Sequence, residues 1–502
     1  MNAKQSKVYL VGAGPGDAML ITRRGFACIQ KADYIIYDRL VNPALLEAAP
    51  AGCQFHYVGK AAGRHYLPQE EITELIVRCA QAGGNVVRLK GGDPYVFGRG
   101  GEEALRLAEL GLPFEVVPGI SSSIGGLCYA GFPITHRELA RSFHVVTAHT
   151  NSHGMEQARL NVLAQEDGTL VFLMGLSQVR TICQGLIQAG KPAETPAAVV
   201  SHATTARQRT VVGTLASLAD AVERAKLTSP AIIVVGEVVT LRDQLNFFET
   251  RPLFGRTFLV TRTSSKSGGL QALLEEQGAA VLHAPMLELK PVPHALDAAM
   301  AKIEQFTHIV FTSQVTVAQF FAALDAVGKD ARALHNAKLC VVGSATAQAL
   351  RQYGLRADII PARFTAEGLC EALLPQLTAS DHVLLPQSAA ARPVLRETLQ
   401  HCCSVTAVAL YTSEAADCDV AAVQAKLCAG DIDGITFTSS AAVHHFAGSV
   451  GFATIIAQKI PVYSIGTVTS QTLKTYGVVP VTSEESTMQS LTQTILKQYQ
   501  VR

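Results

Sequence analysis

The sequence predicts an α/β protein built from two successive two-lobed α/β folds. Apolar runs of strand length alternate with helical patterns along the 502 residues, and this alternation indicates mostly parallel sheets covered by helices. Hydrophobic residues make up 48% of the chain and charged residues only 17%, as in compact enzymes with buried strands and unlike disordered chains. The length allows two to four domains of about 150 residues each.

The overall charge and the cysteines argue against several classes of function. The net charge is +1, so no global field would attract nucleic acid or a membrane surface. The 11 cysteines are scattered without a CxxC pair, which favours free thiols in a reducing compartment over disulfides or a metal site. The polar start leads directly into a strand, and no apolar run reaches the ~18 residues of a membrane span. We therefore expect a cytoplasmic protein.

The expected elements follow one another in a regular order. In the first half they are a strand at 8–11, a helix around 22–30, a strand at 33–37, buried strands at 169–174 and 231–235, and an amphipathic helix at 238–248. Residues 249–255 hold a proline and a glycine, which mark a junction too short to be a long tether. A strand at 257–260 then restarts the alternation. This boundary predicts domains at 1–248 and 254–502, with 249–253 as the linker.

Three glycine-rich turns follow predicted strands in the first half: GAGPGD at 12–17, GGDP at 91–94 and VPGISS at 117–122. The carboxyl ends of parallel strands meet at one edge of a sheet, and glycine lets a ligand approach bare backbone there. The first turn is not a dinucleotide fingerprint, because Asp17 stands at its sixth position and Pro15 stiffens it. A nicotinamide oxidoreductase is therefore a disfavoured alternative, and we expect another nucleotide-like ligand.

The most informative stretch is VVRLKGGDPYVFGRGGEE at 86–103, where an apolar strand runs through a glycine-rich turn into a helix that begins with two carboxylates. Arg99 and Glu102 are three residues apart, so they would share one face of that helix. Asp93 in the turn is suited to accept hydrogen bonds from an amine or a hydroxyl. The stretch predicts a ligand site.

With YDRLV at 37–41, VGKAAGRH at 58–65 and GFPITHR at 131–137, these segments resemble uroporphyrinogen-III C-methyltransferase over about residues 6–248. The resemblance implies two α/β lobes with S-adenosylmethionine between them, usually in a homodimer. It also implies transfer of two methyl groups to pyrrole carbons of uroporphyrinogen III, which gives precorrin-2 and S-adenosylhomocysteine. A methylase of another tetrapyrrole position is a rival, which the combination of 86–103 with YDRLV disfavours.

The resemblance also assigns roles to residues. Asp38 and Lys60 match positions that move protons, and the matches to substrate-binding positions are Arg99, Glu102 and Arg137. The cofactor-binding matches are Pro15, Gly91, Gly92, Asp93, Val96, Ser121, Ser122, Met174 and Ala203. The alternatives are surface ion pairs for the arginines and Glu102, a turn cap for Asp38, a solvated Lys60 and core packing for Met174.

An internal echo marks the second half. The segment FTS at 311–313, with apolar residues at 317 and 320, matches FTS at 437–439 with apolar residues at 443 and 446. A second pair, VGSAT at 342–346 and IGTVT at 465–469, is followed by a leucine and a glycine at the same spacing. The echoes predict two similar lobes with hydroxyls after their strands, where α/β sheets bind ligands.

These segments, with VTRTSS at 260–265 and ALYTSE at 409–414, resemble uroporphyrinogen-III synthase over about 254–498. The resemblance implies cyclisation of hydroxymethylbilane with inversion of the last ring, and lobes at 254–286 plus 413–502 and at 287–412. It assigns assistance of hydroxyl departure to Tyr411. Hydroxyls placed to hold carboxylates are those of Thr312, Ser313, Thr346, Thr438, Ser439 and Thr467, with Arg262 and Arg392 as further partners.

Alternatives stay open for this half too. Each of these hydroxyls could instead cap the N-terminus of a helix, and Tyr411 could instead pack within its strand. The sequence favours a bifunctional enzyme of sirohaem and cobalamin synthesis whose second half makes the substrate of the first. The main rival is a methyltransferase whose second half is a non-catalytic tetrapyrrole-binding module.

Overall fold

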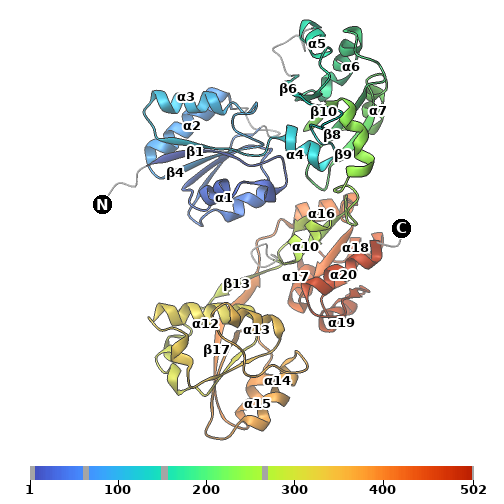
Figure 1. Ribbon diagram of the computed structural model, residues 1–502. Helices are drawn as coiled ribbons and strands as arrows, with labels where there is room; N and C mark the ends of the chain where they lie inside the picture. The colour runs from blue at the N-terminus through green and yellow to red at the C-terminus, as the bar shows by residue number, and fades with distance from the viewer. Residues whose placement is uncertain (1–5, 60–66, 149–156, 263–268, 500–502) are drawn as a thin grey trace. The chain divides into compact units, whose positions relative to one another are not determined.

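The computed structural model describes residues 6–59, 67–148, 157–262 and 269–499, which form four five-stranded sheets with flanking helices (Figure 1). The predicted α/β class is confirmed. By compactness the chain divides into two units. One holds Met1–Phe258, Gly269–Leu282 and Thr492–Arg502, and the other holds Leu259–Gly268 and His283–Leu491. The domain and lobe limits expected from the sequence stay a proposal.

The first sheet positions the glycine-rich turns. Its strands are β1 (Lys7–Gly12), β2 (Tyr34–Tyr37), β3 (Gln54–Tyr57), β4 (Asn85–Lys90) and β5 (Phe114–Val117), in the order β3-β2-β4-β1-β5. All neighbouring strands are parallel, so their carboxyl ends lie at one edge. The connection from β1 leads to β2, on one side of β1, whereas the connection from β4 leads to β5, on the other side of β1. Open α/β sheets bind ligands at such a switch point.

Helices cover both faces of this sheet. They are η1 (Ala18–Leu20), α1 (Arg23–Ile29), η2 (Pro43–Ala48), α2 (Gln69–Ala82) and α3 (Gly100–Glu109), with α4 (Ser122–Tyr129) after β5. Figure 1 shows α2 and α3 on one face and α1 on the other. Val86 of β4 packs with α2 and α3, whereas Val87 and Leu89 pack with α1 and η2. The strand alternates between two buried faces, as expected for a central parallel strand.

The second sheet corrects one expectation. Its order is β6-β7-β10-β8-β9, from β6 (Phe143–Thr147), β7 (Thr169–Leu173), β8 (Pro196–Ser201), β9 (Arg209–Thr214) and β10 (Ala231–Val235). Only β6 and β7 are parallel, so the prediction of mostly parallel strands is wrong here. Residues 202–208 join β8 to β9 without a helix, and so short a connection forces an antiparallel pair. The helical segments are α5 (Gln157–Leu163), η3 (Leu176–Gln178), α6 (Val179–Gln188) and α7 (Leu218–Ala225).

The helix predicted at 238–248 is also shorter than expected. The structure has a 3₁₀ turn, η4 (Glu237–Leu241), followed by the single-turn helix α8 (Arg242–Leu245). Val238 and Val239 are both buried. The helix ends at Asn246, whose backbone is extended and whose side chain accepts a hydrogen bond from the Glu249 amide.

The second half has two further sheets. One, in the order β12-β11-β18-β19-β20, contains β11 (Thr257–Val260), β12 (Ala280–His283), β18 (Gly434–Phe437), β19 (Val462–Ser464) and β20 (Val481–Thr482). The other, in the order β13-β17-β16-β14-β15, contains β13 (Leu287–Pro291), β14 (His308–Phe311), β15 (Lys338–Val341), β16 (His382–Ser388) and β17 (Ser404–Ala415). The strand predicted at 257–260 is thus confirmed as β11.

Helices flank these two sheets as well. The α-helices are α10 (Leu270–Glu276), α11 (Asp297–Met300), α12 (Gln314–Ala326), α13 (Ser344–Arg351), α14 (Ala366–Leu373), α15 (Val394–Gln400), α16 (Val420–Ala429), α17 (Ser440–Ser449), α18 (Ala453–Gln458), α19 (Thr467–Thr475) and α20 (Met488–Tyr499). Short 3₁₀ turns are η5 (Ile303–Gln305), η6 (Ala331–Leu334) and η7 (Leu374–Gln376). No helix in the described stretches is long and apolar enough to cross a membrane.

The internal echo of the second half is a repeat of packing geometry. Phe311 and Phe320 meet edge to face with ring centroids 5.2 Å apart, and Phe437 and Phe446 do so at the same 5.2 Å. All four rings are fully buried. In each repeat a strand ends at the first phenylalanine, and the next helix carries the second. The repeated segments therefore share one strand–helix packing arrangement, and the two similar lobes stay a prediction.

Candidate functional site

The three glycine-rich turns of the first half form one backbone cradle at the carboxyl edge of the first sheet. The Gly92 amide donates to the Gly14 carbonyl at 2.7 Å, and the Gly14 amide donates to the Gly92 carbonyl at 3.2 Å. Asp93 links the cradle to the third turn, because its Oδ2 accepts from the Gly119 amide at 2.9 Å. Its Oδ1 accepts from the Tyr95 amide at 2.8 Å. Asp93 therefore shapes the cradle, and its contact with a ligand stays a prediction.

Two of these glycines are required by packing. A Cβ atom at Gly119 would lie 2.2 Å from the Gly92 carbonyl oxygen, and one at Gly12 would lie 2.5 Å from the Gly119 backbone. Such distances are far below van der Waals contact with rigid main chain, so any side chain would push the turns apart. The sequence predicted that the turns meet, and the structure shows how closely.

The loop after β8 closes on the first turn. The Asp17 amide donates to Thr204 Oγ1 at 3.0 Å, and the Tyr129 hydroxyl donates to Asp17 Oδ2 at 2.9 Å. Burial, with the Asp17 carboxylate beside it, raises the pKa of Tyr129, so this hydroxyl keeps its proton. The turn that holds Pro15 and the loop that holds Ala203 are therefore joined by direct hydrogen bonds.

Met174 and Ala203 lie at the same edge of the second sheet. Both β7 and β8 are antiparallel to β10 and so run in the same direction, with Leu173 and Ser201 ending them beside the start of β10. Met174 is 53% exposed, which rules out the alternative that it is plain core packing. Ala203 is buried beneath this edge.

Backbone strain gathers in the same loops. Non-glycine residues with left-handed φ angles include Phe97 (53°), Arg99 (60°), Met174 (57°), His202 (49°) and Thr204 (65°). Each such conformation costs about 1 kcal/mol or more and persists where the surroundings hold it. All five are predicted site residues or direct neighbours of one, and strained residues of this kind cluster at binding sites.

The predicted pair of Arg99 and Glu102 is present on one face of α3. Arg99 Nη2 and Glu102 Oε2 are 2.6 Å apart, and both side chains are about half exposed. Arg99 lowers the pKa of the Glu102 carboxyl through these hydrogen bonds. Arg137 is also exposed, in the short turn bridged by His136 and Ala140. Lys60 lies outside the described residues.

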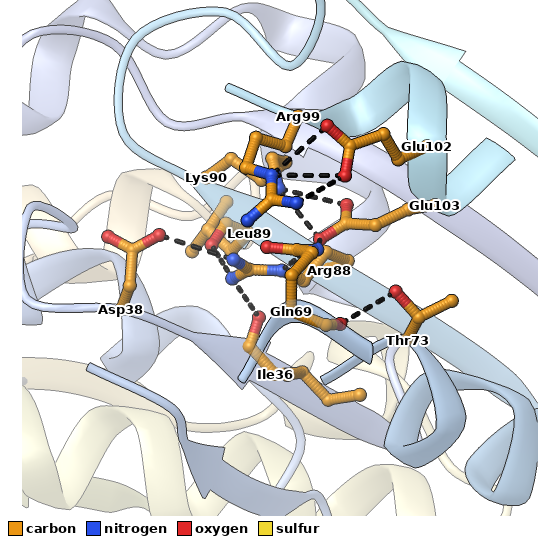
Figure 2. Close-up of polar contacts among 10 residues, drawn as sticks. All are labelled: Ile36, Asp38, Gln69, Thr73, Arg88, Leu89, Lys90, Arg99, Glu102 and Glu103. Atoms are coloured by element: carbon orange, nitrogen blue, oxygen red, sulfur yellow. Dashed lines mark hydrogen bonds and ion pairs between the residues drawn. The ribbon is translucent and has the colours of Figure 1, made fainter. Parts of the chain in front are cut away.

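Asp38 follows β2 at the same edge as the cradle. Its Oδ1 accepts from the Leu40 amide at 3.0 Å, so Asp38 does cap its turn, as the alternative interpretation expected. Its Oδ2 lies 3.4 Å from Arg88 Nη2 (Figure 2). The carboxylate therefore caps its turn with one oxygen and faces a buried guanidinium with the other.

A buried charge cluster stands behind Asp38, and sequence reasoning missed it. Figure 2 shows Arg88 and Lys90 on β4 meeting Glu103 of α3, with Gln69 of α2 beside them. Arg88, Lys90 and Glu103 are all less than 5% exposed. The signal was present in the sequence, because two basic residues at alternate positions of a central strand must share a buried face.

In the second half, two serines act as helix N-caps. Ser313 Oγ accepts from the Thr316 amide at 3.2 Å, and the Thr316 hydroxyl lies 3.2 Å from the Ser313 amide, which completes a capping box on α12. Ser439 Oγ accepts from the Ala442 amide at 3.2 Å on α17. The N-cap alternative is therefore confirmed for both serines, which does not exclude a second bond to a ligand.

The threonines of this half differ from one another. Thr312 and Thr438 are partly exposed directly after β14 and β18. Thr346 is buried in the first turn of α13, whereas Thr467 is the exposed first residue of α19. In the repeat, Thr346 therefore corresponds to the equally buried Thr469 and not to Thr467.

Tyr411 lies in β17 at a register shift. Ser388 of β16 pairs with Tyr411, whereas Gln387 pairs with Ala409, so one residue of β17 is extra at this point. On its other side Tyr411 pairs with Pro291 of β13. Such bulges are common beside active sites. The side chain is 8% exposed and packs in the core of this lobe, in keeping with the strand-packing alternative.

The two predicted arginine partners are in different settings. Arg392 is exposed and pairs with Glu367 at 2.9 Å. Burial lowers the pKa of the Arg262 guanidinium. Arg262 is thus a half-buried cation at the carboxyl end of β11.

Family comparisons follow the same division of the chain. The model of the family Tetrapyrrole (Corrin/Porphyrin) Methylases matches residues 7–219, and that of Uroporphyrinogen-III synthase HemD matches residues 269–493. The Porphyrin biosynthesis protein HemD of Ruminiclostridium josui is 37% identical over 493 residues, which cover 98% of this chain and 97% of that protein. This chain belongs to that family of porphyrin biosynthesis proteins.

A further relative and a solved structure are named as methyltransferases. The Uroporphyrinogen-III C-methyltransferase of Bacillus subtilis (strain 168) is 42% identical over 355 residues, or 70% of this chain and 73% of that protein. A solved Uroporphyrin-III C-methyl transferase from Thermus thermophilus, complexed with S-adenyl homocysteine, is 39% identical with a TM-score of 0.40, covering 46% of this chain and 93% of its own. The family predicted for each half is confirmed: a tetrapyrrole methylase followed by a HemD-type synthase.

Proposed function

We propose that this chain makes uroporphyrinogen III from hydroxymethylbilane with its second half and methylates it twice with its first half. The product is precorrin-2, a precursor of sirohaem and cobalamin. The observation that carries the methylase half is the closed backbone cradle of Gly14, Gly92 and Gly119, with Asp93 tying two of its turns together. The occurrence of both family domains in one chain carries the pairing of the two activities.

The cradle fits a nucleoside-type cofactor, because it offers main chain without side chains at the switch point of the first sheet. S-adenosylmethionine supplies an electrophilic methyl group when it is bound there. The proposed cofactor contacts are those of the sequence prediction, from Pro15 through Ala203. Methyl transfer then depends on holding the pyrrole carbon in line with the methyl group of the cofactor. Such alignment raises the effective concentration of the reacting groups by many orders of magnitude.

The polar residues around the cradle have proposed roles in substrate binding and proton transfer. Arg99, Glu102 and Arg137 bind the substrate, whose carboxylates suit guanidinium groups and whose pyrrole N–H groups suit a carboxylate. Asp38 and Lys60 move the protons that leave the ring after methylation. The turn amide and Arg88 support this role of Asp38, because they hold its carboxylate at the cradle edge.

In the second half, the protein folds the linear tetrapyrrole and assists the departure of its hydroxyl group. Tyr411 is the proposed donor for that step. Hydroxyls and helix-start amides after β14, β15, β18 and β19 are proposed to hold the substrate carboxylates. The partly exposed positions of Thr312 and Thr438 support this role more than the buried position of Thr346 does.

One anaerobic incubation tests both activities. Purified protein receives hydroxymethylbilane and S-adenosylmethionine, and the products are followed by mass and visible absorbance. We expect a type III macrocycle that carries two added methyl groups. Unmethylated type I uroporphyrinogen would show that the second half does not cyclise, which leaves a methyltransferase with a tetrapyrrole-binding appendage.

We also propose a homodimer formed through the first half and a cytoplasmic location. The dimer rests on the family resemblance alone, and sedimentation equilibrium of the full chain tests it. The cytoplasmic location is supported by the eleven cysteines, all of which are unpaired in the structure.

A further inference from the structure

Lys90 occupies an unusual place for a lysine. It is the last residue of β4, the central strand of the first sheet, and it is 3% exposed. Its carbonyl accepts from the Ala13 amide at 2.8 Å, so its backbone is part of the cradle wall. Its side chain points with Val86 and Arg88 to the face that α2 and α3 cover. Burial of Arg88 and Lys90 side by side on one face of the strand lowers the stability of the fold unless an anion compensates the two charges.

Glu103 is that anion. It is fully buried in the first turn of α3, where the helix dipole also favours a negative charge. Both of its oxygens accept from Lys90 Nζ, at 2.8 and 2.9 Å. Its Oε1 also accepts from Gln69 Nε2 at 3.0 Å and from Arg88 Nε at 3.3 Å.

Arg88 connects this pair to the edge of the site. Its Nη1 donates to the carbonyls of Ile36 and Leu89, at 3.3 and 3.0 Å. Its Nη2 is directed to Asp38 at 3.4 Å (Figure 2). The guanidinium is thus held at one end by Glu103 and presents its other end to the Asp38 carboxylate.

We propose that Lys90 and Glu103 are positioning residues for methyl transfer, whose ion pair keeps the Arg88 guanidinium against Asp38. The inference rests on the proposed function, because it assumes that Asp38 accepts a proton there. While Lys90 is protonated, it satisfies both Glu103 oxygens, and Arg88 is shared with Asp38. When Lys90 loses its proton, Glu103 has Arg88 as its one cationic partner, draws it inward and leaves Asp38 unsupported.

The cluster makes this switch accessible near neutral pH. Burial and the neighbouring Arg88 charge lower the pKa of the Lys90 ammonium to about 8, against the opposing effects of Glu103 and Asp38. The other described charge that senses Lys90 is the exposed Glu102 on α3. The support for Asp38 is therefore present below about pH 8 and is lost as the pH rises through that value.

The first test needs no variant. For the full chain with saturating S-adenosylmethionine, kcat and KM of uroporphyrinogen III methylation are measured between pH 6.5 and 9.5 under anaerobic conditions. We expect kcat to fall as the pH rises above about 8 while KM changes little, because Lys90 does not touch substrate. A kcat that is flat over this range overturns the inference, whereas absence of methylation at every pH refutes the proposed function.

Variants then assign the alkaline fall to the cluster. Glu103→Gln should abolish it, because no carboxylate then draws Arg88 away from Asp38 when Lys90 loses its proton. Lys90→Met should also abolish the alkaline fall. It should leave kcat reduced about 10-fold or more at every pH, since a small displacement of a catalytic group lowers the rate strongly. Unchanged positions of the fall in both variants would overturn the proposal.

Two controls separate positioning from folding. Thermal unfolding and the Kd for S-adenosylmethionine report whether the first half of each variant is folded. Lys191→Met is the matched control, because Lys191 is also partly buried, with its pKa lowered by that burial, and its ammonium donates to the Glu166 carbonyl away from Asp38. It should leave the pH dependence of kcat unchanged. A shift of the alkaline fall in this control would contradict the assignment to Lys90.

Discussion

Asp93 and Asp38 show how one carboxylate can serve structure and site together. Each uses one oxygen to accept a backbone amide two residues ahead, from Tyr95 and Leu40 respectively. The second oxygen of each joins separate parts of the site, the third turn for Asp93 and Arg88 for Asp38. The sequence identified these two aspartates, whereas their hydrogen-bond partners could be known only from the folded structure.

The glycine at position 119 offers a sharp test. Gly119→Ala should weaken S-adenosylmethionine binding by at least about 10-fold, or about 1.4 kcal/mol, because the new Cβ would lie 2.2 Å from the Gly92 carbonyl oxygen. Isothermal titration calorimetry measures the Kd. Gly52→Ala is the control, since a Cβ there meets no atom within 4 Å. Equal affinity in both variants would contradict the steric role of Gly119.

In the second half, two of the predicted binding hydroxyls cap helices. Both repeats place a serine cap directly after a buried strand, so each hydroxyl has a structural duty before any ligand arrives. The helix predicted at 238–248 is shorter than expected, because the backbone becomes extended at Asn246. Local pattern indicates that an element exists, whereas its length depends on what it packs against.

Substitution of the α12 cap tests whether Ser313 also binds substrate. Ser313→Ala should lower the free energy of unfolding by about 1 kcal/mol and also raise KM for hydroxymethylbilane by roughly 10-fold, as expected for a lost bond to a carboxylate. Thr365→Ala removes the matching cap of α14, where Thr365 accepts from the Gly368 amide at 3.1 Å. That control should lose similar stability with KM unchanged. An unchanged KM in Ser313→Ala would leave the residue as a cap alone.

At the scale of the whole molecule, two family domains in one chain predict separable activities. Tyr411→Phe keeps the ring in its core position and removes only the hydroxyl. We expect kcat for cyclisation to fall by about 100-fold, as for loss of a proton donor, while methylation of supplied uroporphyrinogen III is unchanged. Steady-state assays of each step measure this.

Tyr353→Phe is the control for that experiment. Tyr353 stacks on Phe321 at 4.1 Å in the same lobe and is 40% exposed, so removal of its hydroxyl should change neither activity. A cyclisation rate in Tyr411→Phe equal to that of the control would show that Tyr411 serves strand packing only.

The sequence by itself determined the fold class, the two families and the three turns that meet at one sheet edge, because these depend on local patterns of glycine and apolar residues. The structure alone decided the strand directions of the second sheet and the burial of Thr346. It also decided the grouping of Arg88, Lys90 and Glu103 behind Asp38. Strand direction and charge pairing depend on which segments become neighbours in space, and single-chain periodicity carries no information about that.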